Sequence, residues 1–433
     1  MVFATPSSSR KPNPERVIAA IDIGGSKAAC MIASLTSPMR GTTEVEIIGV
    51  GQHGIVSREK RMDAASATES AIRVAVEAAE RMAGVRIKKA TITVHATQVL
   101  NRRIGVDLDL SGGAVTQEDV RDCLEKGASI AAHESAIPLH ALPIRFCVDG
   151  EDVGANPSGI VGGILSAEML GLGVRNGHDA NLRSLLERAG IEVERMVASP
   201  LAAAHTVLSE DEKDLGCLMV DIGARSAEFA VFEECALVAC GGVKVGGEHI
   251  TRDIAQIFGG TISYAERIKA LHGSVLVGDG DDHRFIDIPQ IGASENSVSV
   301  SRAELCAVIA PRLEEILSLV FDEAEKAVGR RSSSGLRRAV ITGGGSLLTG
   351  ARDTAERIFG VKTRLGRPTA LSGAPDAATA PQFSACVGAI LYVAQPEELN
   401  FFDGDFSFSH GDMALAKREG ILGGVTQWMK MNF

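Results

Sequence analysis

The chain contains the run Val17-Ile18-Ala19-Ala20-Ile21-Asp22-Ile23-Gly24-Gly25-Ser26-Lys27, which continues into apolar residues 28–32. A second run of the same form, Cys217-Leu218-Met219-Val220-Asp221-Ile222-Gly223-Ala224-Arg225-Ser226, continues into apolar residues 227–232. Each run predicts a buried strand that ends near an aspartate, a tight turn of small residues and a second buried strand. One such hairpin is ordinary in any sheet. Two copies, together with the glycine cluster Gly343-Gly344-Gly345-Ser346, predict a phosphate-binding site divided between two halves of the chain.

The residue types in these turns suit a nucleotide. Glycine lets a turn adopt positive φ and leaves no side chain between the backbone N–H groups and an anion. An aspartate at the mouth of the turn can hold a hydrated Mg²⁺ ion, a hard cation that prefers carboxylate and water ligands. Two hairpins of this kind that face each other would clamp a nucleoside triphosphate from both sides.

The overall composition is that of a large globular protein. The 433 residues, 45% hydrophobic and 23% charged, are enough for roughly two to four domain-sized units. The net charge of −11 argues against a nucleic-acid-binding protein, since no basic stripe is present. Eight scattered cysteines without a Cys-x-x-Cys pair favour buried reduced thiols over a zinc site. Residues 1–16 predict a disordered tail and not a signal peptide, and no run reaches the ~20 apolar residues of a spanning helix.

The order of predicted elements indicates an α/β fold with an inserted module. Residues 44–50 predict a third strand after the first hairpin, and residues 64–82 a helix that ends at Gly84. From about residue 87 to 173 the pattern changes to a compact α+β module. A helix of small residues over 198–204 and a polar loop over 210–214 lead to the second hairpin. Later predicted elements are helices over 251–258, 302–328, 350–359 and 383–393 and a strand over 338–341.

This order resembles the actin and DnaK-type ATPase superfamily, and within it the FtsA family of bacterial cell-division proteins. The resemblance covers about residues 17–394. Besides the two hairpins and the Thr342 to Ser346 loop, it rests on five short segments, which are Asn156-Pro157-Ser158-Gly159, Gly246-Gly247-Glu248-His249-Ile250-Thr251, Ala265-Glu266-Arg267-Ile268-Lys269, Ser301-Arg302 and Val308-Ile309-Ala310-Pro311-Arg312.

The resemblance implies an actin-like (ribonuclease H-like) two-lobed ATPase fold with an inserted α+β subdomain. The implied division is a first lobe core over 17–86 and 174–213, the insertion over 87–173, a second lobe core over 214–245 and 320–396, a further subdomain over 246–319, and a flexible linker over 397–420.

The resemblance also implies site roles for ATP and Mg²⁺. Asp22 and Asp221 would hold Mg²⁺ through water. The backbones of Gly24, Gly25, Ser26 and Gly223 would wrap the phosphates. Gly343, Gly344 and Gly345 would pass beneath the adenosine, and Glu266 and Lys269 would flank the ribose and adenine. The other implied nucleotide-binding residues are Lys27, Gly246, Gly247 and Ser346.

The second hairpin departs from the family pattern Asp-Ile-Gly-Gly-Gly-Thr-Thr-Asp. Ala224 and Arg225 replace two glycines, and Ala227 replaces a threonine. Their Cβ atoms would narrow the approach of a phosphate, although the Arg225 guanidinium could contact a phosphate itself. Ser199 stands where DnaK-type relatives keep a glutamate, so no carboxylate is expected there to polarise water. These departures predict that ATP is bound and is hydrolysed slowly or not at all.

The C-terminal residues predict an amphipathic helix. Ile421, Leu422, Val425, Trp428, Met429 and Phe433 fall on one stripe at helical spacing, and Lys417 and Arg418 precede them. An aromatic-rich stripe with nearby cations is typical of a helix that lies in a membrane interface. A helix docked on the protein's own core is the alternative. The linker that precedes the helix favours the membrane interpretation, because it would let the helix extend to a lipid surface.

The family resemblance implies the following partners: the C-terminal peptide of the tubulin-like protein FtsZ, further copies of the chain in filaments, later division proteins that meet the insertion, and lipids of the cytoplasmic membrane. Arg302 and Arg312 are implied to bind the FtsZ peptide, and a solvated helix face is the alternative for both. Two other functions are open: a pilus-assembly protein of the same fold, and a sugar kinase. His178-Asp179-Ala180-Asn181 resembles a catalytic loop of sugar kinases, but Asp179 also suits a helix N-cap.

Overall fold

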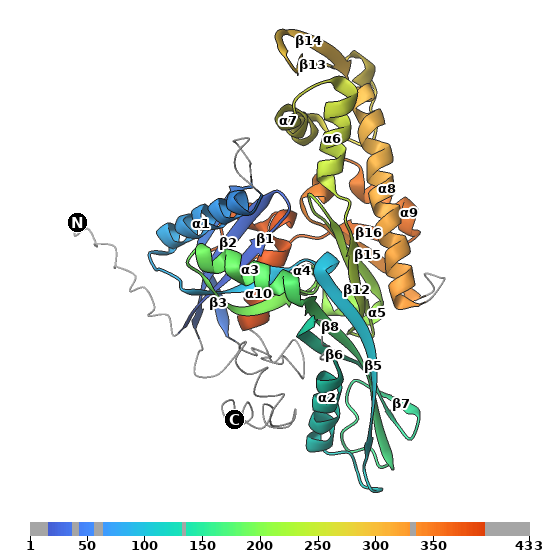
Figure 1. Cartoon of the computed structure of the whole chain (residues 1–433). Coiled ribbons are helices and arrows are strands. Elements are labelled where there is room, and N and C mark those ends of the chain that lie inside the picture. Colours follow the sequence, from blue (N-terminus) through green and yellow to red (C-terminus); the bar gives the residue numbers. More distant parts are fainter. Residues whose placement is uncertain (1–15, 37–42, 56–63, 132–135, 330–334, 395–433) are drawn as a thin grey trace, which may run out of the picture.

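A computed structural model describes residues 16–36, 43–55, 64–131, 136–329 and 335–394 (Figure 1). The predicted N-terminal tail up to residue 15, the whole linker over 397–420 and the amphipathic helix over 421–433 lie outside the described residues. None of the helices in the described part of the chain has both the length and the apolar character needed to cross a lipid bilayer.

The first lobe is built on a five-stranded sheet with the strand order β3-β2-β1-β4-β9. Its strands are β1 (Arg16–Ile23), β2 (Lys27–Thr36), β3 (Glu44–Gly54), β4 (Lys89–Val94) and β9 (Glu192–Ala198). β1 and β2 form the first predicted hairpin, antiparallel with Asp22 opposite Ala29, and β4 runs parallel to β1. The helices α1 (Ala64–Ala83) and α3 (Asn176–Arg188) belong to this lobe.

The second lobe repeats this plan in the order β12-β11-β10-β15-β16. The strands are β10 (Cys217–Ile222), β11 (Ala227–Glu233), β12 (Ala236–Val243), β15 (Arg338–Thr342) and β16 (Lys362–Leu365). β10 and β11 are the second predicted hairpin, and β15 runs parallel to β10 as β4 does to β1. Both hairpins are therefore confirmed, and each is followed in its sheet by a parallel strand. α8 (Arg302–Val328), which has the bounds expected from the sequence, and α9 (Ala351–Phe359) belong to this half.

Two helices of small and apolar residues lie between the lobes (Figure 1). α4 (Ser199–Val207) is almost wholly buried, and α10 (Ser384–Ala394) packs against it. The two backbones approach so closely that a Cβ at Gly388 would lie 1.7 Å from the Ala202 carbonyl oxygen. Only a glycine fits this crossing, which confirms that the small-residue helix allows a close helix contact.

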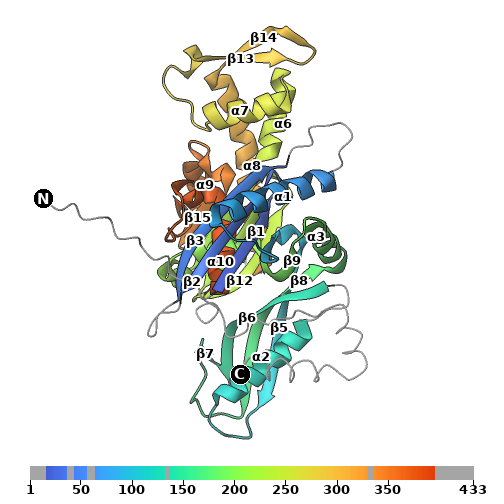
Figure 2. The same cartoon turned by 90° about the vertical axis from the view of Figure 1, so that its left-hand side faces the viewer.

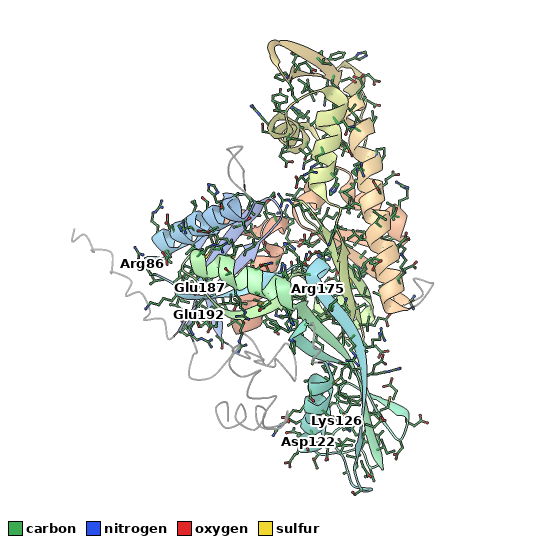
Figure 3. The ribbon with its side chains drawn as sticks, in the orientation of Figure 1. Arg86, Asp122, Lys126, Arg175, Glu187 and Glu192 are labelled. Carbon is green, nitrogen blue, oxygen red and sulfur yellow. The ribbon has the colours of Figure 1, made fainter. Side chains whose placement is uncertain are left out.

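The insertion forms a separate layer at the bottom of Figure 1. It contains η1 (Ala96–Gln98), β5 (Val99–Asp109), α2 (Gln117–Ala131), β6 (Ala136–Val148), β7 (Glu151–Gly154) and β8 (Ile164–Arg175), with the sheet order β5-β8-β6-β7. α2 covers this sheet over a core of its own that includes Leu124, Phe146 and Met169. Figure 3 labels Arg175 where the insertion returns to the first lobe at the start of α3.

The start of the insertion at residue 87 was predicted too early. β4, over 89–94, is a strand of the first-lobe sheet, and the insertion begins after it. The sequence pattern of a single strand does not show which sheet the strand joins.

The polar segment 210–214 is a helix, α5 (Glu210–Leu215), and not a loop. The reason is a capping box: Ser209 accepts the Glu212 N–H, and the Glu212 carboxylate accepts the Ser209 N–H.

An extension at the top of the second lobe completes the fold, and Figure 2 shows it at the end opposite the insertion. It contains α6 (Gly247–Phe258), α7 (Ile262–His272), η2 (Asp281–His283) and the hairpin of β13 (Phe285–Gln290) and β14 (Ala293–Ser301). α8 runs from this extension down along the lobe as one helix, across the expected boundary at 319/320. Three short 3₁₀ segments, η4 (Gly344–Leu347), η5 (Asp376–Thr379) and η6 (Pro381–Phe383), lie between β15 and α10 in the sequence.

Candidate functional site

A cleft of about 450 Å³ lies between the two lobes, and both hairpin turns line it. The structure brings most of the predicted nucleotide-binding residues to this one cleft: Asp22, Gly24, Gly25, Ser26, Lys27, Asp221, Gly223, Gly247, Glu266, Lys269, Gly343, Gly344 and Gly345. Gly246 and Ser346 stand just behind the lining. A Cβ at Gly246 would lie 2.6 Å from the Gly223 carbonyl oxygen, and the Ser346 hydroxyl donates to the Gly343 carbonyl at 2.7 Å.

The first hairpin presents a carboxylate and a cation. Its turn is closed by a hydrogen bond from the Gly24 N–H to the Lys27 carbonyl, 2.8 Å long. The Asp22 carboxylate is nearly buried and accepts the Thr93 hydroxyl of β4 at 2.6 Å. The Lys27 ammonium lies 4.1 Å from the centre of the Phe383 ring. Burial lowers the pKa of Lys27, while the field of Asp22 acts in the opposite direction.

The second hairpin has the same turn, closed by the Gly223 N–H on the Ser226 carbonyl at 2.9 Å. Asp221 stands directly opposite Glu228 in the β10–β11 register, so the two acids share one face of the sheet. Burial, then the fields of Glu228 and Asp22, raise the pKa of Asp221 to about 7. Gly343 has φ 81°, and a Cβ there would lie 2.1 Å from Asp221 Oδ1. The first glycine of the cluster therefore leaves room for the Asp221 carboxyl.

Arg225 does not lie in the cleft. Its guanidinium donates to the Glu248 carboxylate at 2.9 Å, and its side chain packs against Gly25 of the opposite hairpin, where a Cβ would be 2.7 Å from Arg225 Cγ. The expectation that Arg225 could reach a phosphate fails in this structure because Glu248 holds the cation at the rim. Ala227 is buried in β11, whereas Ala224 and Ser199 do line the cleft.

His95 and Glu228 line the cleft as well, and the sequence analysis missed both. His95 Nδ1 donates to Glu228 Oε1 at 2.8 Å, and Nε2 donates to the Ile23 carbonyl at 2.9 Å, so both ring nitrogens carry a proton. Burial lowers the pKa of His95, but the Glu228 carboxylate outweighs it and raises the value to about 10. The position of His95 in the sequence could have indicated its role. His95 directly follows strand β4, which pairs in parallel with β1, so the ends of the two strands lie side by side.

The other end of the cleft combines a polar network with an apolar wall. Lys269 Nζ donates to Glu266 at 2.7 Å, to the Thr251 hydroxyl at 2.8 Å and to the Gly247 carbonyl at 3.0 Å. Thr251 also donates to Glu266. Leu271 and Leu347, exposed by 64% and 48%, line the same cleft. No pattern in the sequence distinguished these leucines from core residues.

The two arginines predicted to bind a partner have different surroundings. Arg302 lines the cleft and donates to Asp281 Oδ1 at 2.9 Å. Arg312, on the same helix, pairs with Asp253 at 2.6 Å and Glu315 at 2.5 Å. Both side chains are part-buried, 25% and 29% exposed, and neither is a free cation on a solvated face.

The motif that favoured a sugar kinase is not at the cleft. α3 begins at Asn176 and its N-cap is Arg175, so Asp179 is within the helix and is not its cap. The buried Asp179 carboxylate pairs with Arg183 at 2.9 Å and does not line the cleft.

The two sheets, the glycine turns and the shared cleft define an actin-like ATPase fold. The PilM–PilN type IV pilus biogenesis complex has a chain of similar fold, with a TM-score of 0.60 at 17% identity, over 88% of this chain and 99% of that one. MreB5 of Spiroplasma citri bound to ADP gives a TM-score of 0.50 at 14% identity, over 89% and 99%. At these identities the likeness concerns the fold alone.

The chain belongs to the FtsA family of cell division proteins. The family model of cell division protein FtsA matches residues 218–388, and that of the SHS2 domain inserted in FtsA matches residues 95–171. Cell division protein FtsA of Agrobacterium fabrum is 34% identical over 440 residues, which cover 99% of this chain and 97% of the relative. The Escherichia coli FtsA is 28% identical, with coverage of 97% of each. The SHS2 match begins at residue 95, directly after β4, where the structure also places the start of the insertion.

Proposed function

We propose that the chain binds one ATP with Mg²⁺ between its lobes. The observation that carries this proposal is that Asp22 and Asp221, from opposite hairpins, line one cleft together with the glycine turns. The backbone amides of residues 24–26 and of Gly223 would contact phosphate oxygens, and Lys27 would add a positive charge. Glu266 and Lys269 would flank the ribose and adenine, with Leu271 and Leu347 as the apolar wall for the base.

The donor set of the cleft fits a hydrated Mg²⁺ ion. Within the described residues, no three His, Cys, Asp or Glu side chains come close enough to hold a metal directly. Asp22 and Asp221 would therefore hold the ion through water, while phosphate oxygens complete its shell. When bound, Mg²⁺ neutralises charge on those oxygens.

Slow hydrolysis follows from the acids around the cleft. Ser199 offers no carboxylate. Glu228 lines the cleft, where its Oε1 accepts hydrogen bonds from His95 and Ser226, and its Oε2 is buried, without a hydrogen-bond partner among the described residues. Only the buried Oε2 is therefore left to accept the proton of an attacking water, because Oε1 already accepts two hydrogen bonds. We expect turnover below ~1 s⁻¹, the low end of ordinary enzyme rates.

For the cellular role, we propose an actin-like protein that forms filaments and tethers FtsZ to the inner face of the cytoplasmic membrane at the division septum. Membership of the FtsA family supports this role, as do the amphipathic residues Ile421 to Phe433. The FtsZ C-terminal peptide would bind near Arg302 and Arg312, and later division proteins would bind the insertion. The protein would be peripheral, held by lipid contacts of its C-terminal helix.

Sedimentation with anionic lipid vesicles tests the cellular role. The full chain should pellet with vesicles, and more FtsZ peptide should pellet when the chain and ATP are present. A variant that lacks residues 421–433 should stay in the supernatant as a soluble, ATP-binding protein. If the truncated variant still pellets as a dispersed species, the membrane assignment is wrong.

A further inference from the structure

Residues 95–103 form a continuous strap from the cleft to the insertion. The strap begins with His95 at the end of β4, passes through η1 and continues into the first half of β5. Its first residue belongs to the cleft and its last residues belong to the insertion sheet. Along this short path it makes side-chain hydrogen bonds to the second lobe at both ends.

At the insertion end, the strap bonds to the open edge of the second-lobe sheet. The Asn101 amide donates to the Cys240 carbonyl at 2.8 Å, and the Arg103 guanidinium donates to the Val238 carbonyl at 3.2 Å. Val238 and Cys240 are two residues apart on the edge strand β12, so their carbonyls point the same way. Asn101 and Arg103 have the same spacing on β5. Asn101 and Arg103 therefore match Cys240 and Val238 in register. Their side chains bind carbonyl groups at the edge of the sheet with which another strand could otherwise form hydrogen bonds.

At the cleft end, His95 bonds to both lobes. It donates to Ile23, next to Asp22 in the first hairpin, and to Glu228, opposite Asp221 in the second hairpin. A change in the angle between the lobes must therefore displace the strap at one end or the other.

The insertion is also attached to the first lobe, through a buried side chain. His140 of β6 is buried, accepts the Ala198 N–H at Nε2 at 3.1 Å, and contacts the Tyr392 hydroxyl at 3.0 Å through Nδ1. By contrast, Asn101 and Arg103 are exposed residues. Ile144, also of β6, packs against the hydrophobic clusters of both lobes.

We propose that the strap couples the nucleotide cleft to the orientation of the insertion. A ligand that contacts both hairpins favours the lobe arrangement in which both contacts form. His140 joins the insertion to the first lobe, and Asn101 and Arg103 join it to β12 of the second lobe. A change in the angle between the lobes would therefore tilt the insertion relative to β12. Nucleotide would thus control how the insertion is presented to a partner. This inference rests on the proposed binding of ATP in the cleft.

Distance measurement between spin labels tests the coupling. One spin label is attached to Asp122→Cys on α2, an exposed position marked in Figure 3, and the other to Glu323→Cys on α8. The measurement uses the full chain, in which the exposed Cys235 is changed to Ser so that it takes up no label. Adding Mg·ATP should shift the mean distance by on the order of 2 Å or more. In the variant Asn101→Ala with Arg103→Ala, that shift should disappear and the distribution should broaden, with ATP affinity within about twofold of the parent.

Arg102→Ala is the matched control. Arg102 lies between the two strap residues, but its guanidinium donates to the Ile130 carbonyl of the insertion's own helix at 3.1 Å. It should keep the ATP-dependent shift. Calorimetric ATP binding on the same samples separates the two proposals. If ATP binds and the double variant keeps the parent's shift, or the parent shows none, the coupling is wrong. If no ATP binds, the proposed function fails, and the coupling with it.

Discussion

The hairpin of β1 and β2 and the hairpin of β10 and β11 have the same turn but present different charges to the cleft. Gly24 to Lys27 and Gly223 to Ser226 are closed by equivalent hydrogen bonds of 2.8 and 2.9 Å. In the first hairpin the cation, Lys27, lines the cleft. In the second hairpin the cation, Arg225, is paired with Glu248 at the rim.

The aspartates of the two hairpins also differ in their surroundings. Asp22 is opposite Ala29 and accepts a hydroxyl from Thr93, whereas Asp221 is opposite Glu228 and has its pKa raised to about 7. The first hairpin therefore brings a cation and a hydrogen-bonded acid to the cleft, and the second hairpin brings two neighbouring acids. Backbone similarity between the two hairpins does not imply equal contributions to binding.

The largest effects are expected from Asp22→Asn and Asp221→Asn. Each should weaken Mg·ATP binding about 10–100-fold, the usual loss when a group that orients a metal's ligands is removed. Affinity for ATP in EDTA should change much less, because the carboxylates act through the ion. Asp122→Asn, on the insertion, is the charge-matched control. Wild-type Mg·ATP affinity in either cleft variant would refute the assigned Mg²⁺ contact.

Lys27→Ala should weaken ATP binding about tenfold, which corresponds to about 1.5 kcal/mol, the lower end of what a hydrogen bond to a charged group contributes. Arg225→Ala should change the affinity by less than about twofold because Glu248 already engages the guanidinium. The comparison of the hairpins is wrong if calorimetry gives equal losses for the two substitutions.

Asp221 predicts a pH dependence of the nucleotide-free protein. Its folded pKa, about 7, is above the ordinary value of 3.8. Its contribution to the free energy of unfolding is therefore complete below about pH 4 and is lost as the pH rises to about 7. Urea unfolding should show a loss of up to about 4 kcal/mol over this window that is absent in Asp221→Asn. An unchanged pH profile in Asp221→Asn would contradict the raised pKa. The contribution of His95 lies in a separate window, lost between about pH 6.5 and 10.

A small gain in affinity is expected from restoring the family glycines with Ala224→Gly and Arg225→Gly. Loss of the Arg225 side chain removes its contact with Gly25 and widens the approach to the turn. ATP should bind up to about threefold tighter, or about 0.6 kcal/mol in binding free energy. A loss as large as that of Lys27→Ala would instead identify Arg225 as a phosphate ligand.

Local patterns in the sequence predicted the hairpins, the long helix from Arg302 and the close helix contact of α4, because strand and helix periodicity and small-residue runs are local signals. The start of the insertion was misplaced because pairing of β4 with β1 and β9 depends on distant strands. The bond between His95 and Glu228 joins residues 133 positions apart, and the pair of Arg225 with Glu248 requires the fold that brings α6 to the turn. Such contacts leave no periodic trace in the chain.

Calorimetry tests most directly whether both hairpins share one nucleotide. Mg·ATP is titrated into the full chain, into Asp22→Asn, into Asp221→Asn and into the double variant. We predict one site per chain, weakened by either substitution, and a double variant whose loss is smaller than the sum of the single losses, because both acids hold the same ion. Two sites per chain, or strictly additive losses, would show that the hairpins act separately and would contradict a shared site.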